Sequence, residues 1–256
     1  MSRLQPARGT ADLLPNDMAK HRLVIEAARA AVSRYGFQEM ATPIFEFSEV
    51  FSRPLGESSD IVTKENYSFA DRGGEMLTLR PENTAGVVRA VISGGLTQNL
   101  PLKYFYAGPM FRYERPQKGR MRQFHQVGIE YLGPDHSLAD AEVITCGARL
   151  LAALGVLDDC VLHINSLGDG ESRTVYRSAL IDYLEGFEDQ LSDDSKTRLK
   201  VNPLRILDSK DVGDRSILKN APQLQDYLND DSKTHFARTV AALDAAGVTW
   251  VFDPLL

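Results

Sequence analysis

The sequence predicts an α+β fold in which an antiparallel sheet is flanked by helices and carries a helical insertion. Three observations support this prediction. Two stretches rich in aromatic and β-branched residues, Tyr104–Tyr113 and Phe124–Leu132, have the composition of strands, and the loop between them holds Pro, Gly and cations. Helical patterns lie on both sides of this hairpin in the chain. From about residue 168 to residue 247 the chain consists of charged helical segments, with no repeat and no strong strand pattern.

Side chains alternate along a strand, so the second arm of the hairpin has two faces. One face carries Phe124, Gln126, Gly128 and Glu130, and the other carries His125, Val127, Ile129 and Tyr131. In the first arm Arg112 and Glu114 share a face. A glycine between a glutamine and a glutamate leaves room for a ligand on the sheet. An antiparallel sheet with one solvated polar face explains the same pattern, and both interpretations remain open at this point.

The N-terminal part begins with an irregular segment, Arg8–Pro15. A helix is expected from Asn16, which can cap it, to about Arg34, with Gly36 just beyond its end. Phe37–Pro43 then has the pattern of a strand that a proline stops.

The next part of the chain combines a helix and a short hairpin. Phe45–Leu55 is predicted to form a short helix that Gly56 ends. Asn66–Ala70 and Met76–Arg80 are predicted to pair across the turn sequence Asp-Arg-Gly-Gly.

Pro81 is expected to open the following helix, where its missing N–H costs nothing. Glu82 and Thr84 would then lie in the first helical turn. The helix dipole favours an acid at this position without any ligand. The functional alternative is that Glu82 and Thr84 receive the ammonium group of a ligand.

After the long hairpin, Leu138–Leu154 is predicted as a helix and Cys160–Asn165 as a strand. The later helical segments are Glu171–Glu185, Leu191–Leu199, Pro222–Leu228 and Ser232–Ala246. Val248–Phe252 is predicted as a strand that returns to the main sheet.

Composition places the chain among ordinary globular proteins. Its 256 residues are 43% hydrophobic and 25% charged, which suits one large domain or one domain with an insertion. No apolar run approaches the roughly 20 residues that cross a membrane, and the first residues, MSRLQPARGT, lack a secretory core, so we expect a cytoplasmic location. Cys146 and Cys160 do not have metal-site spacing and are expected to be reduced thiols.

The charge of the chain is unevenly distributed. A net charge of −6 argues against a protein that coats nucleic acid. Residues 112 to 122 nevertheless carry five cations against the single acid Glu114: Arg112, Arg115, Lys118, Arg120 and Arg122. A solvated loop explains this cluster, and so does a site for a triphosphate or an RNA end.

Three ordered motifs resemble those of a known family. FRYE (residues 111–114), the basic loop and RQFHQVGIE (122–130) are similar to motif 2 of the class II aminoacyl-tRNA synthetases, and of the histidyl-tRNA synthetase family in particular. RPENTAG at Arg80–Gly86 and RGTADLLP at Arg8–Pro15 resemble that family's histidine-binding and N-terminal signatures. KENYSF departs from the family's usual KEMYTF at Asn66 and Ser68. The resemblance extends through essentially all 256 residues.

The resemblance implies a class II synthetase-like antiparallel sheet. It divides the chain into a catalytic core with motifs 1 and 2 at residues 1–167, a helical insertion at 168–246, and a returning strand of the core at 247–256. Asn202–Lys210, with the sequence NPLRILDSK, closely resembles the inserted part of the family. The helix, strand and proline of residues 16–43 correspond to motif 1, which implies a homodimer through this region.

The activity that the resemblance implies is that of a histidine–tRNA ligase. L-Histidine and ATP, with Mg²⁺, would give histidyl-adenylate and pyrophosphate, and the histidyl group would then pass to the terminal ribose of tRNA(His). By resemblance, Glu82, Thr84 and Gln126 bind the α-amino group of histidine, and Asn83 belongs to the same signature. Glu130 would accept from the imidazole, because a carboxylate on a water-poor sheet face is costly unless it is paired. His125 points to the other face and is expected to pack.

The remaining site residues are assigned to ATP. Arg112 is the expected catalytic residue, because a guanidinium can bridge the histidine carboxylate and the α-phosphate. Phe124 would stack on adenine, Glu114 would accept from its amino group, and Arg120 would bind the outer phosphate, with Arg122 a weaker candidate. An ion pair between Arg112 and Glu114, and core packing of Phe124, are the alternatives. No metal ligand is assigned.

The resemblance also implies parts that these 256 residues do not contain. The family continues into a segment of the form LVRGLDYY, motif 3 and an anticodon-binding domain, so we expect this polypeptide alone to form adenylate slowly or not at all, with unpaired sheet edges. Two other functions remain open: a non-catalytic synthetase-like regulatory subunit of histidine biosynthesis, and a histidine- or RNA-binding module without chemistry. The intact motif 2 pattern favours the ligase.

Overall fold

The computed structural model describes residues 4–55, 65–115, 117–254 and 256. The chain divides into two compact units. The first unit comprises Met1–Asp135 and Cys146–Leu157, and the second comprises His136–Thr145 and Asp158–Leu256. Residues 158–167 and 247–256, which we assigned to the catalytic core, thus fall in the second unit. The predicted boundaries of the helical insertion, at residues 167 and 246, remain a prediction.

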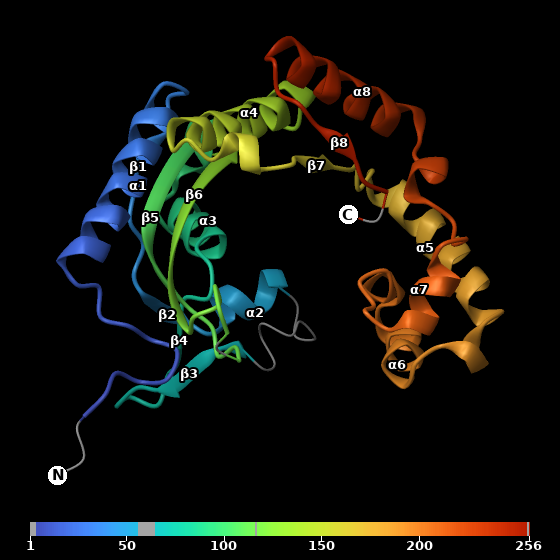
Figure 1. The fold of residues 1–256 in the computed structure, drawn as a ribbon, viewed down its shortest axis with the longest axis horizontal. Coiled ribbons are helices and arrows are strands. Elements are labelled where there is room, and N and C mark those ends of the chain that lie inside the picture. Colours follow the sequence, from blue (N-terminus) through green and yellow to red (C-terminus); the bar gives the residue numbers. More distant parts are fainter. Residues whose placement is uncertain (1–3, 56–64, 116, 255) are drawn as a thin grey trace. The chain divides into compact units, whose positions relative to one another are not determined.

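A long antiparallel hairpin forms the centre of the first unit (Figure 1). Strand β5, Leu102–Phe111, pairs with β6, Gln123–Leu132, over its whole length, from Leu102 opposite Leu132 to Phe111 opposite Gln123. The short strand β1, Gln38–Glu39, adds to β5 in the parallel direction. The predicted hairpin and the α+β class are confirmed, while the strand expected over residues 37–43 is only two residues long.

Helix α1, Pro15–Ser33, begins one residue before the predicted cap. Pro15 occupies the start of the helix, Leu14 is the N-cap residue, and the side chain of Leu14 makes no capping bond. Just past the end of α1, Gly36 has a φ of +80°, which favours glycine. His21 of α1 contacts His125 of β6 edge to face, with ring centroids 4.7 Å apart. His125 therefore lies on the face opposite Glu130 and packs there, as expected.

A second sheet has the strand order β2–β4–β3, formed by Phe45–Phe47, Met76–Leu79 and Tyr67–Ala70. The hairpin of β3 and β4 was predicted. The prediction of helix over residues 45–55 is wrong at its start, because Phe45–Phe47 pairs with β4 and only Glu49–Leu55 forms helix α2. Within Phe45–Phe47 only Glu46 is buried, because successive side chains of a strand point to opposite faces. Gly56 lies outside the described residues.

Helix α3, Thr84–Ser93, packs on the even-numbered face of the hairpin, where Val87 shares a buried cluster with Tyr106 and Met110. Asn83 is its N-cap residue, so Pro81 and Glu82 precede the helix and do not form its first turn as expected. The turn Leu96–Asn99 (η2) follows α3 and leads to β5.

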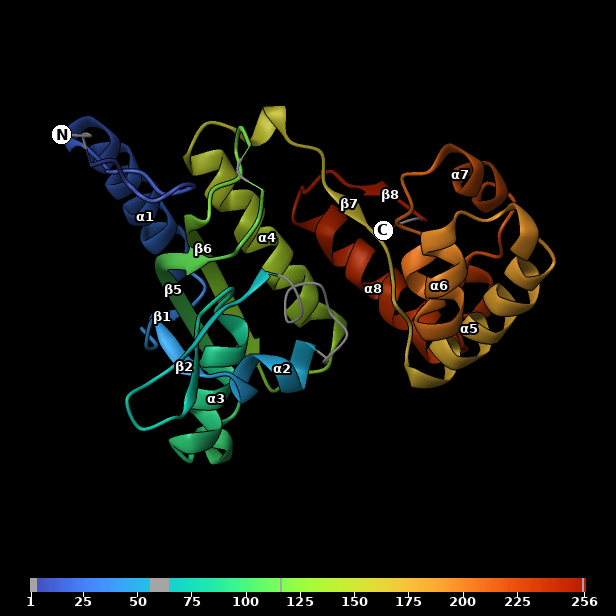
Figure 2. The ribbon, with the colours of Figure 1, turned by 90° about the horizontal axis from the view of Figure 1, so that it is seen from below.

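The second unit is mostly helical (Figure 2). Its helices are α5 (Gly170–Glu185), α6 (Asp193–Val201), α7 (Val212–Leu218) and α8 (Asp230–Ala245), with short 3₁₀ turns at Glu188–Gln190, Pro203–Ile206 and Leu224–Tyr227. A further 3₁₀ turn, Leu157–Asp159, has residues in both units. Helix α4, Ser137–Ala153, has residues in both units. Helix α7 was not predicted, and the helix expected over residues 222–228 is only a 3₁₀ turn.

The last strand does not pair with the main sheet as expected. Strand β8, Val251–Phe252, pairs in parallel with β7, His163–Ile164, in a sheet of two strands. Its neighbour in the chain, Asp253, adds a bond from its backbone N–H to the carbonyl of Ile164. Separately, no helix within the described ranges is long and apolar enough to cross a membrane.

Candidate active site

The predicted site residues of strand β6 lie on one face of the hairpin. The register places Tyr106 opposite Gly128, Gly108 opposite Gln126 and Met110 opposite Phe124. Residues directly opposite each other share a face. The guanidinium carbon of Arg112 lies 5.3 Å from the ring centroid of Phe124, which places Arg112 on the face that also carries Glu130.

Glu130 is bound at one end of this face by two hydroxyl groups. Thr84 Oγ1 donates to Glu130 Oε1 at 2.7 Å, and the Tyr106 phenol donates to the same oxygen at 3.3 Å. Burial raises the pKa of the Glu130 carboxyl and the charge of Glu82 raises it further, while the two hydroxyl donors lower it; the net pKa is raised. Glu130 is therefore a partly buried acceptor, and no cation of the described residues pairs with it.

Tyr106 is a site residue that we did not predict. Its side chain is 5% exposed and lies over Gly128, where an added Cβ would stand 2.2 Å from Cζ of the tyrosine ring. The space that the sequence suggested for a ligand above Gly128 is thus filled by this ring. Burial raises the pKa of Tyr106, and the nearby charge of Glu130 raises it further, so the phenol stays a neutral donor. The pairing of an aromatic residue with a cross-strand glycine was the available signal.

Gln126 has an unused acceptor on the same face. Its Oε1 atom is buried and has no hydrogen-bond partner within the described structure. A buried polar atom without a partner is uncommon in folded proteins and indicates a site for a ligand or a water molecule. Oε1 of Gln126 can therefore accept a hydrogen bond from a bound ammonium group.

The start of α3 brings Glu82 and Thr84 together but turns Asn83 away. The backbone N–H of Ala85 donates to both carboxylate oxygens of Glu82, at 3.1 and 3.3 Å. Asn83 is 1% exposed, and its Oδ1 accepts from Thr42 Oγ1 at 2.6 Å. Asn83 therefore supports the loop from within, and the structure does not bring it into the cluster with Glu130.

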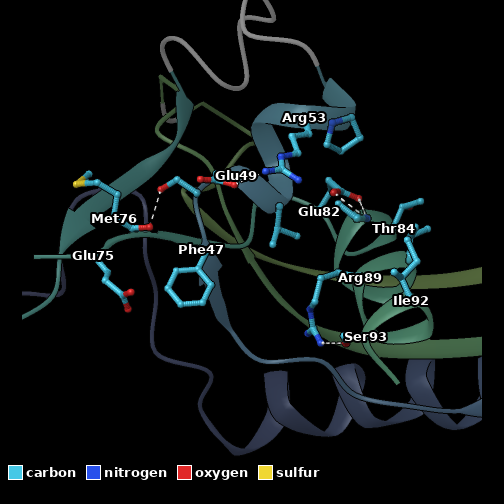
Figure 3. A pocket seen from close by; sticks show the side chains of 15 residues that line it. Phe47, Glu49, Arg53, Glu75, Met76, Glu82, Thr84, Arg89, Ile92 and Ser93 are labelled. Carbon is cyan, nitrogen blue, oxygen red and sulfur yellow. Dashed lines mark hydrogen bonds and ion pairs between the residues drawn. The ribbon is translucent and has the colours of Figure 1, made fainter. Parts of the chain in front are cut away.

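A cleft of about 1140 Å³ adjoins this cluster (Figure 3). Glu82 and Thr84 lie on one side of the cleft at the start of α3, and Arg53 of α2 lies nearby. The cleft continues along Arg89, Ile92 and Ser93 of α3 and reaches Phe47 and Met76 of the second sheet. Of the predicted site residues only Glu82 and Thr84 line it.

Arg112 is held from two sides. Its Nε donates to the carbonyl of Pro81 at 2.9 Å, and its guanidinium lies over Phe124. The ion pair with Glu114 that we considered is long, at 4.0 Å from Nη1. The Pro81 contact thereby links the motif 2 arginine directly to the loop that carries Glu82 and Thr84.

Glu114 is shared by the arginines of the basic loop. Arg120 Nη1 donates to its carboxylate at 3.2 Å, although the Arg120 side chain is 63% exposed. Arg122 donates from Nε to the Glu114 carbonyl at 3.1 Å and lies 3.8 Å from the Tyr113 ring centroid. Arg122 therefore packs against Tyr113. The side chain of Arg120 is mostly exposed, so it has room to turn from Glu114 toward a bound anion.

The base of this loop is also bound by the N-terminal segment. The carbonyl of Gly9 accepts from the backbone N–H of Arg122 at 2.7 Å and of Gln123 at 3.2 Å. Gly9 has a φ of +84°, and a Cβ there would stand 2.6 Å from Arg122 Cγ. A glycine is required at this contact on both grounds.

Arg80 is a second residue that the sequence analysis did not assign. It is 6% exposed and donates from Nε to the Pro109 carbonyl at 2.9 Å and from Nη1 to the Thr42 carbonyl at 3.0 Å. Burial lowers the pKa of its guanidinium, and the charge of Glu46 acts in the opposite sense. Arg80 thus fastens the loop before α3 to strand β5.

The carboxylates of the site do not form a metal-binding group. Within the described ranges no three His, Cys, Asp or Glu side chains are arranged to hold a metal ion. Glu114, the carboxylate nearest the basic loop cations, is already bonded to Arg120. A divalent cation here would therefore depend on oxygen ligands from a bound nucleotide and from water.

Comparisons with known proteins show which family the chain belongs to. A family model described as histidyl-tRNA synthetase matches residues 9–168. The chain is 59% identical over 256 residues to a histidine–tRNA ligase of Rhodospirillum rubrum, covering all of this chain and 62% of that protein. The structure is similar to apo histidyl-tRNA synthetase of S. aureus, with a TM-score of 0.78 and 35% identity over 98% of this chain and 57% of that one.

A more distant structure from Bacillus halodurans C is described as an ATP phosphoribosyltransferase regulatory subunit/histidyl-tRNA synthetase. It matches with a TM-score of 0.63 at 22% identity over 99% of this chain and 68% of that one, and shows the shared fold alone. The chain spans about 62% of the length of the R. rubrum relative. On the family match and these identities, the chain belongs to the histidyl-tRNA synthetase family.

Proposed function

We propose that this chain carries the histidine- and ATP-binding part of a histidine–tRNA ligase. One observation carries the proposal: the carboxylate of Glu130, the unpartnered oxygen of Gln126 and the guanidinium of Arg112 are all on the same face of one hairpin. Such a face offers acceptors to the donor groups of histidine and a cation to its carboxylate and to a phosphate.

The histidine molecule would lie on the face that carries Gln126 and Glu130, above the Tyr106 ring that fills the space over Gly128. Its ammonium group would donate to Gln126 Oε1, to Glu82 and to the lone pairs of Thr84, whose hydrogen is used by Glu130. Its imidazole N–H would donate to Glu130. Amino acids without a ring donor would leave a desolvated carboxylate unpaired, and such a mismatch discriminates strongly against them.

Arg112 would be the catalytic residue for adenylate formation. A carboxylate oxygen of histidine attacks the α-phosphorus of ATP, the bond to the β-phosphate oxygen breaks, and pyrophosphate leaves. The carboxylate is already a nucleophile, so alignment and neutralisation of charge are the main requirements. Arg112 would bridge the carboxylate and the α-phosphate, Phe124 would stack on adenine, Glu114 would accept from the adenine amino group, and Arg120 would leave Glu114 to bind the outer phosphate.

Several further features belong to the same proposal. Mg²⁺ would accompany the phosphates of ATP and reduce their negative charge, and the acceptor end of tRNA(His) would receive the histidyl group. The region of α1 and β1 would form a homodimer, residues 168–246 would be a helical insertion, and the protein would act in the cytoplasm. The family membership supports each of these features.

Histidine-dependent exchange between ATP and pyrophosphate tests the function. The chain is measured alone and after joining it to the segment of the R. rubrum ligase that it does not match. We expect exchange by the joined protein, and a loss of about 100- to 1000-fold in Arg112→Ala because charge neutralisation at the α-phosphate is removed. Arg72→Ala, an exposed arginine in the β3–β4 turn, is the matched control and should retain wild-type exchange.

The regulatory-subunit alternative gives a different result. A non-catalytic relative would bind histidine, measured by calorimetry, without supporting exchange in either form of the protein. A joined protein that neither binds histidine nor catalyses exchange would contradict both functions.

A further inference from the structure

The two carboxylate oxygens of Glu130 have different surroundings. Both donors, Thr84 Oγ1 at 2.7 Å and the Tyr106 phenol at 3.3 Å, bond to Oε1. Within the described residues no hydrogen bond reaches Oε2. The carboxylate is thus held at one oxygen and open at the other.

Tyr106 is held rigidly enough to fix this arrangement. Its ring fills the space over Gly128, where a Cβ would stand 2.2 Å from Cζ, 2.3 Å from the phenol oxygen and 2.6 Å from Cε2. The same side chain belongs to a buried cluster with Val87 and Met110. The phenol therefore has little freedom, and its position follows from the absence of a side chain at residue 128.

We propose that Tyr106 is a positioning residue for histidine recognition, which lodges over Gly128 and, together with Thr84, holds Oε1 of Glu130 so that Oε2 faces the ligand as the acceptor for an imidazole N–H. This inference rests on the proposed function. It assigns to Tyr106 an indirect role in specificity, since Tyr106 acts through Glu130 and does not itself bind the ring donor.

The arrangement makes the selectivity of the site depend on Tyr106. A carboxylate held at one oxygen presents one acceptor in one direction, so it distinguishes a ring nitrogen that carries a hydrogen from one that is methylated or replaced by sulfur. A carboxylate without the phenol could rotate and accept from other donors, including water. Loss of the phenol should therefore weaken binding of histidine more than binding of a ring-methylated histidine.

The test is Tyr106→Phe in the joined protein, which keeps the ring and removes the donor. We expect the KM for histidine in the exchange assay to rise about tenfold, because one hydrogen bond to a charged group is lost, with kcat within about twofold. The preference for histidine over a ring-methylated histidine should fall by a similar factor. Tyr131→Phe, on the opposite face of β6 against Phe37, is the matched control and should change neither value.

The pH dependence of the KM for histidine is a second measurement. It should not change if Tyr106 only stabilises the fold. The groups that face the Glu130 carboxyl are Tyr106 on β5, Thr84 at the start of α3, and Glu82 just before it. Tyr106 is one of the two donors that lower the pKa of Glu130, so its removal should move the acidic limb of the histidine KM profile to higher pH. The profile of Tyr131→Phe should coincide with that of the wild type.

A second variant approaches the same contact from β6. Gly128→Ala should displace the phenol and reproduce the rise in KM, whereas Gly147→Ala in α4, where a Cβ meets nothing within 4 Å, should not. If the wild type is active and Tyr106→Phe matches it in KM and pH profile, or if only kcat falls, this inference is overturned. If the wild-type joined protein neither binds histidine nor supports exchange, the proposed function fails and the inference fails with it.

Discussion

Two carboxylates accept hydrogen bonds from hydroxyl groups, Glu130 in the first unit and Asp214 in the second, but they differ in how many bonds they accept and at which oxygens. Asp214 of α7 is 0% exposed and accepts four hydrogen bonds: from Ser192 N at 2.9 Å, Ser192 Oγ at 2.7 Å, Ser195 Oγ at 2.6 Å and Ser209 Oγ at 2.6 Å. These bonds occupy both of its oxygens. Glu130 accepts two bonds, and both reach one oxygen.

The pKa values of the two groups move in opposite directions. Burial by itself raises the pKa of Asp214, but the hydrogen bonds from Ser195, Ser209 and Ser192 outweigh it and lower the pKa to about 2. Burial of Glu130 is not outweighed, and its pKa is raised. A carboxylate whose two oxygens both accept hydrogen bonds stabilises its fold, whereas a carboxylate with one unbonded oxygen can still bind a ligand.

The largest expected effect is on stability. Asp214→Ala leaves three serine hydroxyls and one backbone N–H without their common acceptor, so we expect the free energy of unfolding to fall by about 3 kcal/mol or more. Urea denaturation followed by circular dichroism measures this change. Asp182→Ala, at an exposed position of α5, should stay within about 0.5 kcal/mol of the wild type. A loss below about 1 kcal/mol for Asp214→Ala would show that the serines find other partners.

Glu130→Gln should separate binding from stability. The amide keeps the shape of the side chain but replaces an anionic acceptor, so we expect histidine affinity to fall about 100-fold in calorimetry. The ligand-free protein should be equally or slightly more stable at neutral pH, because a desolvated charge is removed. Loss of both stability and affinity would indicate that Glu130 is a structural residue like Asp214.

A smaller effect should appear in the pH dependence of stability. The pKa of Asp214 in the folded protein, about 2, lies below its ordinary value of 3.8, so its stabilisation is present above that value and is lost as the pH falls toward 2. Glu130 has the opposite sign: because its pKa is raised, stability falls as the pH rises from the ordinary value of 4.5 through the raised value. Denaturation of wild type, Asp214→Asn and Glu130→Gln between pH 2 and about pH 7 would resolve the two trends.

The smallest expected effect belongs to an exposed carboxylate. Glu39 of β1 accepts two bonds from Arg29 of α1, at 2.7 and 2.9 Å, but both side chains are about half exposed. Glu39→Gln should therefore shift the urea midpoint only slightly, and about 1 M salt should remove the difference from the wild type. A large shift that persists in salt would show that the number of bonds, and not burial, decides the contribution.

The sequence predicted the parts of the site that depend on strand periodicity alone. Alternation along β6 correctly placed Phe124, Gln126 and Glu130 together and turned His125 to the other face, because side chains alternate regardless of the rest of the fold. Arg112 was expected on the same ribbon, and the structure places it over Phe124.

The parts that were missed depend on how strands pair. The role of Tyr106 follows from its register opposite Gly128, which the pattern of a single strand does not contain. Phe45–Phe47 was assigned to a helix because three residues are too few for a period, and its pairing with β4 decides its conformation. The pairing of β8 with β7 could not be predicted for a similar reason, because a strand of two residues can pair with the edge of many different sheets.

The contact between Gly9 and the start of β6 matters for how the protein is handled. One peptide carbonyl near the beginning of the described chain accepts from two successive amides at the foot of the arginine-bearing loop. A purification tag or a deletion ahead of Arg8 changes the chain next to this contact, so we expect it to affect the loop that carries Arg120 although no residue of the loop is altered. Kinetic constants for nucleotide substrates should therefore be compared only between proteins with identical N-terminal residues.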